Sequence, residues 1–255
     1  MKVLKILIII ISLNFSGLSQ LTDNDKPGYT FSAGANGNLI SGNVERLLIL
    51  ASLSASYLAD NWAVKSFNTY QYGEIGNKNT ENDFFSRNFF YLYPKSDLYP
   101  YIMFWWESNK RKAIDSRYQI GAGITAVLMN KGNTSCKISL TLTHENAVYD
   151  GVIFSNSEFN GNNNIAVQRI TGRIAGKQPI ISGNTHLLYE MWYQADIKNF
   201  ANNRFYLNAS LDFNLYKGLS VRLSYNYNFE SVVISRVKKF DSILLFGINF
   251  SGEIN

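Results

Sequence analysis

The stretch Arg204–Glu230, RFYLNASLDFNLYKGLSVRLSYNYNFE, alternates apolar and polar side chains on both sides of the short segment Tyr216–Gly218. Successive side chains of a β-strand point to opposite faces, so this period of two predicts two strands, Arg204–Leu215 and Leu219–Glu230. The apolar positions are Phe205, Leu207, Ala209, Leu211 and Phe213, then Val221, Leu223, Tyr225, Tyr227 and Phe229. The stretch therefore predicts an antiparallel hairpin with one apolar and one polar face.

The same alternation continues outward through the chain and gives about twelve strands in all. The other predicted strands are Tyr29–Leu39, Val44–Leu58, Trp62–Glu74, Thr80–Tyr93, Leu98–Glu107, Ile114–Met129, Thr134–Tyr149, Ile165–Ala175, Thr185–Ile197 and Phe240–Phe250. Strands of globular proteins average about 5–6 residues, whereas a tilted strand that crosses a bilayer needs about 9–11. The length of these strands therefore favours a membrane protein.

An apolar face of this extent cannot lie in water, and a bilayer tolerates no unpaired strand edge, so the sheet must close. An even strand number, period-two alternation and aromatic strand ends are typical of outer-membrane barrels. The sequence predicts an all-β fold, a transmembrane antiparallel up-and-down β-barrel of about twelve strands. A soluble β-barrel that binds a ligand inside is an alternative, in which the apolar face would point inward.

The connections alternate in length, as they do in such barrels, where the periplasmic turns are short. If the chain starts in the periplasm, the periplasmic turns are Ala59–Asn61, Pro94–Asp97, Asn130–Asn133, Gly176–Pro179 and Tyr216–Gly218. The opposite set contains the longer loops Ser108–Ala113, Asn146–Asn164, Lys198–Asn203 and Ser231–Lys239.

Composition excludes several other classes. The 255 residues carry 24 Lys+Arg against 19 Asp+Glu, a net charge of +5, which is too small for a nucleic-acid-binding footprint. Charged residues make up 17% and aromatic residues 15%, which excludes disorder. A single cysteine, Cys136, alternates with apolar residues and is interpreted as an inert apolar side chain.

The N-terminus has the layout of a secretory signal peptide. A basic start, Met1–Lys5, precedes the apolar run Ile6–Leu13, and the small residues Gly17 and Ser19 stand before Gln20. We expect residues 1–19 to be a removed signal peptide and residues 20–255 to form one barrel domain in the outer membrane of a Gram-negative bacterium. The barrel-assembly machinery is then a partner during insertion.

Charges of both signs lie on the inward faces of the predicted strands. The predicted lumen network consists of Arg87, Glu107, Asp115, Arg117, Arg173, Glu190, Asp212 and Arg222. Further inward charges are Arg46, Lys137, Arg169, Arg204, Glu81, Asp83 and Glu145. Buried charges must pair, so these residues predict either an ion-pair network that fills the lumen or the lining of a narrow polar pore.

The residues for enzymatic chemistry are sparse. His144 shares parity with outward-facing leucines, and His186 shares parity with Glu190 on the lumen face. A catalytic triad would need a nucleophile and a carboxylate converging on His186, and Ser182 is one of many nearby serines. We predict no catalytic residue, no metal site and no cofactor.

Two predicted outer loops are rich in cations. Lys110, Arg111 and Lys112 lie in one loop, and Arg236, Lys238 and Lys239 lie in another. Cations near a membrane surface attract anionic head groups. These cations predict that the two loops contact the phosphates of lipopolysaccharide. The alternative is that both loops are simply solvated.

Particular residues also suggest a family. Ser41-Gly42-Asn43 between two strands, Trp62, Tyr99-x-Tyr101, Glu107 and Arg117-x-x-x-Gly121-x-Gly123 follow in that order. This order resembles the YdiY-like (salt-induced) outer-membrane protein family, a domain of unknown function. The resemblance implies an outer-membrane barrel and carries no catalytic residues.

The sequence therefore predicts a non-enzymatic outer-membrane barrel, either a narrow pore for a small solute or an envelope-structural protein. An outer-membrane barrel enzyme that acts on lipids or surface peptides is the alternative. The transported solute, the opening of the lumen and the oligomeric state do not follow from the sequence.

Overall fold

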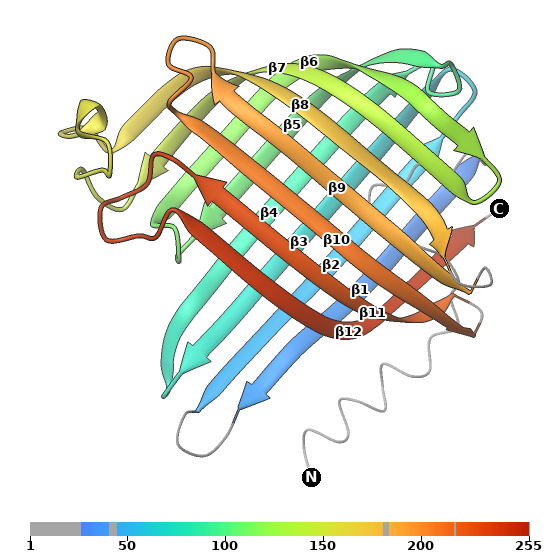
Figure 1. The fold of residues 1–255 in the computed structure, drawn as a ribbon, viewed down its shortest axis with the longest axis horizontal. Helices are drawn as coiled ribbons and strands as arrows, with labels where there is room; N and C mark the ends of the chain where they lie inside the picture. Colours follow the sequence, from blue (N-terminus) through green and yellow to red (C-terminus); the bar gives the residue numbers. More distant parts are fainter. Residues whose placement is uncertain (1–26, 41–44, 181–183, 217, 255) are drawn as a thin grey trace.

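The computed structural model describes residues 27–40, 45–180, 184–216 and 218–254 and forms a closed antiparallel barrel of twelve strands (Figure 1). The strands are β1 (Gly28–Ile40), β2 (Arg46–Leu58), β3 (Trp62–Ile75), β4 (Lys78–Leu92), β5 (Leu98–Asn109), β6 (Ile114–Lys131), β7 (Thr134–Tyr149), β8 (Asn164–Ile180), β9 (Thr185–Asp196), β10 (Asn203–Tyr216), β11 (Leu219–Glu230) and β12 (Phe240–Ile254). Each strand pairs with its neighbours in sequence, and β12 pairs with β1, so the sheet has no free edge.

The hairpin that decided the prediction forms as expected. Arg204 lies opposite Glu230 and Asp212 opposite Arg222, which places both polar faces on the same side of the wall. The apolar sides face outward in a broad belt. Large exposed side chains of this belt include Leu53, Ile102, Ile120, Leu140, Leu142, Leu244, Phe246 and Ile248.

Aromatic rings gather where strands end. Tyr29, Tyr57, Trp62 and Phe90 form a chain of ring contacts with centroids 4.5–6.2 Å apart near the short turns. Such girdles mark the interfacial level of outer-membrane barrels. No helix of the described residues is long and apolar enough to cross a membrane.

Some boundaries differ from the predicted ones. The predicted turn Gly176–Pro179 lies inside β8, where Pro179 pairs with His186 near the end of the strand. The predicted loop Asn146–Asn164 narrows to residues 150–163, because β7 ends at Tyr149, where the predicted strand also ends, and β8 starts at Asn164. The β3–β4 turn is tight because both of its residues, Gly76 and Asn77, have positive φ angles of 53° and 60°.

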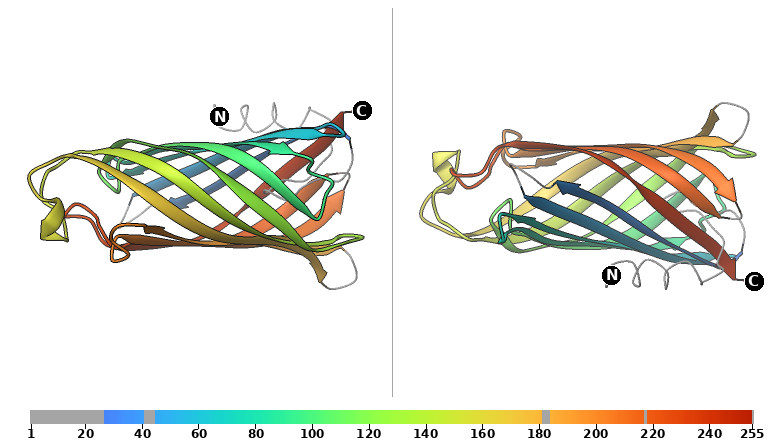
Figure 2. Two further views of the ribbon diagram at one scale, coloured as in Figure 1. Left: turned by 90° about the horizontal axis from the view of Figure 1, so that it is seen from above. Right: turned by 90° about the horizontal axis from the view of Figure 1, so that it is seen from below.

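The longer connections gather at one end of the barrel, here called the long-loop end, and the opposite end is called the short-turn end (Figure 2). Two of the longer loops, residues 150–163 and 231–239, join through a bridge between Phe154 and Ile234. The first of them carries the 3-10 turn η1 (Ser157–Phe159). Together with the neighbouring strand ends they build an apolar loop cluster of Ala113, Ile114, Ala147, Tyr149, Phe154, Ile165, Val232 and Ile234.

Candidate functional site: an ion-paired lumen

The inward faces of the strands hold ion pairs that cross the lumen, and two of them join strands five positions apart in the closed strand order. Arg87 of β4 binds Glu190 of β9, and Arg117 of β6 binds Glu230 of β11. Neither pair joins neighbouring strands, because β4 pairs with β3 and β5 while β6 pairs with β5 and β7. These contacts therefore reach from one wall of the barrel to the other.

The central cross-lumen pair is bidentate. Arg87 donates from Nη1 to Glu190 Oε1 over 2.7 Å and from Nη2 to Oε2 over 3.2 Å. Arg173 Nε donates to the same Oε1 over 2.8 Å. The Arg87 guanidinium also lies 5.1 Å from the ring centroid of Phe67 and 5.8 Å from that of Trp105. A shared carboxylate and flanking aromatic faces hold this cation in place.

The outer cross-lumen pair lies nearer the long-loop end and is part of a larger network. Arg117 donates to Glu230 Oε2 and to Glu107 Oε2, both over 2.9 Å, and to the Tyr149 hydroxyl over 3.0 Å. Lys112 Nζ donates to Glu230 Oε1 over 2.6 Å. Glu230 therefore holds cations from the β5–β6 connection and from β6.

Glu145 of β7 is the second centre of this network and is 1% exposed. It accepts two hydrogen bonds from Arg204, over 2.5 and 2.7 Å, and one from Arg169 over 3.0 Å. Gln119 donates to it over 2.7 Å. Because Arg204 Nε also lies 3.1 Å from Glu230 Oε2, the centres at Glu145 and Glu230 are joined.

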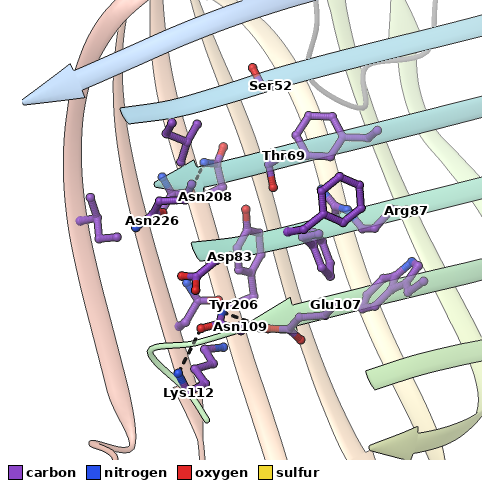
Figure 3. Close-up of a pocket in the computed structure, with 18 of the residues that line it drawn as sticks. Ser52, Thr69, Asp83, Arg87, Glu107, Asn109, Lys112, Tyr206, Asn208 and Asn226 are labelled. Carbon is purple, nitrogen blue, oxygen red and sulfur yellow. Dashed lines mark hydrogen bonds between the residues drawn. The ribbon is translucent and has the colours of Figure 1, made fainter. Parts of the chain in front are cut away.

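A cavity of about 220 Å³ lies in the lumen beside these networks. The central pair and Trp192 line its inner part, and Asn109, Lys112 and Glu230 line the part nearer the long-loop end. Figure 3 shows side chains from β4, β5, β10 and β11 pointing into the same space. The cavity therefore has a mixed lining of polar, charged and aromatic side chains, and both cross-lumen pairs bound it.

Apart from Asp115, the residues of the predicted lumen network belong to three separate groups of ion pairs. Arg87, Arg173 and Glu190 meet at the central pair, and Glu107 and Arg117 meet at the outer one. Asp212 and Arg222 form a pair with distances of 2.5 Å, but they lie directly opposite on neighbouring strands, so this pair lies along the wall.

Asp115 does not belong to the network, which corrects the prediction. Its side chain is exposed, because the pairing of β6 with β7 shifts between Ile114 and Ser116. A β-bulge breaks the simple alternation that placed Asp115 on the face of Arg117.

Two of the predicted lipopolysaccharide contacts point elsewhere. Arg111 Nε donates to Asp83 Oδ2 over 2.7 Å, and Lys112 binds Glu230 in the lumen. Lys110 is exposed and donates to Asn79, while Arg236 pairs with Asp150 over 2.5 Å. Lys238 and Lys239 remain exposed on the β11–β12 loop.

Glu230 was missed in the sequence, although its parity with Asn228 on β11 places it on the lumen face. The aromatic residues of the lumen were missed too. Trp105 contacts Trp192 across the lumen with ring centroids 5.6 Å apart, and Trp192 stacks on Tyr206 at 5.3 Å. An inward aromatic has no distinct sequence signal, because outward aromatics are common in the same strands.

The histidines are apart from these networks. His144 Nδ1 contacts Gln168 Nε2 at 2.9 Å, and His186 Nδ1 contacts Asn214 Nδ2 at 3.3 Å. His186 lies opposite Asp212, whose carboxylate is bound by Arg222, while Ser182 lies outside the described residues. Within the described parts of the chain, no group of three or more His, Cys, Asp or Glu side chains is placed to hold a metal.

A closed antiparallel barrel with an apolar outer belt and a charged, ion-paired lumen defines a protein of the outer-membrane β-barrel class. The chain belongs to the family described as "Protein of unknown function, DUF481", whose model matches residues 32–251.

Solved structures share the fold at low identity. The NanC porin matches with a TM-score of 0.50 and 10% identity, over 88% of this chain and 100% of that chain. The KdgM porin matches with a TM-score of 0.45 and 9% identity, over 89% and 99%. The translocator domain of the autotransporter NalP from Neisseria meningitidis matches with a TM-score of 0.49 and 10% identity, over 91% and 90%. The likeness to the NanC porin concerns the barrel fold. No curated protein matches the chain.

Proposed function

We propose that this protein is a non-enzymatic, narrow outer-membrane pore for a small polar solute, with a resting lumen restricted by ion pairs. The observation that carries the proposal is the presence of two cross-lumen ion pairs beside a cavity lined by polar, charged and aromatic side chains. Barrels of about 8 strands are filled by side chains and those of about 16–18 leave an aqueous channel. A twelve-stranded barrel lies between these cases, so a few side chains decide whether it conducts.

The small stabilisation that buried ion pairs provide favours a lumen that conducts over a lumen that only supports the wall. A buried ion pair is weak evidence for stability, because apolar side chains of similar volume often replace it without loss. A barrel that served only as a wall could fill its lumen with apolar residues. Here Arg87, Arg117 and Glu230 are all less than a tenth exposed and are held by several partners. Such a polar lumen suits the passage of water and a polar solute.

The remaining expectations form part of the proposal. Residues 1–19, which lie outside the described residues, act as a signal peptide, the barrel-assembly machinery inserts the chain, and the chain is similar to the YdiY-like outer-membrane proteins. Lipopolysaccharide contacts are proposed for Lys238 and Lys239, which are exposed on one loop.

Planar-bilayer recordings test the pore. Wild type is expected to conduct little, and the double variant Arg87→Gln/Glu190→Gln is expected to conduct more, because it removes the central pair. Arg173 then lacks its carboxylate partner, so the added current should prefer anions. The matched control is Asp212→Asn/Arg222→Gln, which removes a pair that lies along the wall.

The control is expected to change the current less than the central double variant. If wild type and both double variants stay silent, the pore is excluded and an envelope-structural role remains.

A further inference from the structure

The charged side chains that line the cavity are ion-paired. Every charged side chain that lines it among the described residues has an ionic partner of opposite sign. The pairs are Arg87–Glu190, Arg111–Asp83, Lys112–Glu230, Arg117–Glu107, Arg204–Glu145 and Arg222–Asp212. A charged solute would lose its hydration and would have to compete with these internal pairs. A neutral solute meets no such competition.

The wall formed by β1 to β3 is uncharged. These strands contribute the polar Asn36, Ser52, Thr69 and Gln71 beside the apolar Leu50 and Phe67, and none of their ionised side chains lines the cavity. The neighbouring β11 adds amides and a hydroxyl together with the charged Arg222 and Glu230. The wall formed by β1 to β3 therefore suits a solute that carries several neutral polar groups.

Two polar atoms on that wall are buried without a hydrogen-bond partner. They are Gln71 Nε2, a donor, and Asn36 Oδ1, an acceptor. Asn36 pairs in register with Leu50, and Leu50 pairs with Gln71, so the two residues belong to one row across three strands. A hydroxyl group can both accept from an amide N–H and donate to an amide oxygen. A small movement of either side chain would bring it to a bound hydroxyl.

The inner part of the cavity supplies an apolar surface. Phe67, Phe85, Trp105, Trp192 and Tyr206 all line it. The C–H groups of a sugar ring gain dispersion contacts on aromatic faces, while its hydroxyls remain free for hydrogen bonds. The volume of about 220 Å³ is below the roughly 300–1,000 Å³ of sites for drug-sized ligands. A ligand of monosaccharide size suits a cavity of this volume.

We propose that this cavity is a binding site for a neutral polyhydroxylated solute of monosaccharide size. The proposal rests on the proposed pore and names the class of solute that the pore would take. Arg87 and Arg117 form part of the charged wall, and Gln71 and Asn36 are positioned to bind hydroxyl groups.

The test is saturation-transfer NMR with the full chain in detergent micelles, titrated with glucose, galactose, mannose and xylose. At least one of these sugars should bind, and glucuronate and glucosamine should bind more weakly than their neutral counterparts. Gln71→Leu removes one buried amide and should weaken binding by about five- to tenfold, the effect of one hydrogen bond.

The matched control is Tyr70→Phe, which removes a hydroxyl from the next residue on the outer face, where Tyr70 donates to Asn82. It should leave the affinity unchanged. The proposal is overturned if none of the sugars binds, if the charged sugars bind more tightly, or if Gln71→Leu and Tyr70→Phe have equal effects.

Liposome swelling with the same sugars separates this proposal from the pore. Binding without permeation would overturn the pore and leave the site, whereas permeation without binding would overturn the site and leave the pore.

Discussion

Glu145 offers the sharpest test of whether the lumen is a dry ion-paired network. Glu145→Gln keeps the shape of the side chain and removes its charge, while Arg169 and Arg204 stay buried beside it. One side-chain oxygen also becomes an NH2 donor, which faces guanidinium groups that can only donate.

The magnitude follows from the contacts of this carboxylate. It accepts four hydrogen bonds, two from Arg204, one from Arg169 and one from Gln119. Breaking a buried pair by removing one partner costs about 3–5 kcal/mol, because the remaining charge is left uncompensated. We expect Glu145→Gln to lower the free energy of unfolding by that amount.

The assay is urea unfolding in lipid vesicles, followed by Trp fluorescence and by the shift in gel mobility between folded and heated protein. Removing Arg204 as well, in Glu145→Gln/Arg204→Met, should restore part of the loss, since neighbours in one network are not additive. A loss below about 1 kcal/mol for Glu145→Gln, the value of an exposed pair, would show that water fills the lumen around Glu145 and would refute the reasoning.

Three further predictions test other parts of the molecule. Leu53→Arg puts a charge on the lipid-facing belt and should lower the free energy of unfolding by about 2–4 kcal/mol. Ser52→Arg, on the cavity wall, should lower it less. An equal or larger loss for Ser52→Arg in vesicle unfolding would contradict the assigned facing of β2. Phe154→Ala should loosen the apolar loop cluster and speed cleavage within residues 150–163 by protease added to intact vesicles, while the barrel itself stays folded; an unchanged cleavage rate would show that the loop is not held by this packing. The Lys95 ammonium, which donates to Asp60 over 2.7 Å, holds the pKa of that exposed carboxyl below its ordinary value. The contribution of this pair to stability is therefore present above the pKa of Asp60 in the unfolded chain and is lost as pH falls through its pKa in the folded protein. In Lys95→Gln the pKa of Asp60, measured by NMR titration, should rise to its ordinary value, and an unchanged pKa would contradict the pairing.

The sequence by itself determined the wall of this barrel. Strand period, strand length and the alternation of short and long connections are local properties, and each follows from where successive side chains point. The hairpin of β10 and β11 shows this directly, because the alternation in sequence placed Asp212 and Arg222 on one face, and their register then paired them.

Only the tertiary structure decided what happens inside the wall. Which arginine meets which carboxylate across the lumen depends on closure of the barrel, which brings β4 to β9 and β6 to β11 although these strands never pair. The exposure of Asp115 and the inward turn of Lys112 depend on a bulge and a loop conformation that break the period of two. The face on which a side chain lies follows from its position in its own strand, whereas its partner across the lumen depends on how the whole barrel closes. The sequence therefore predicted the face of each charge but not its partner.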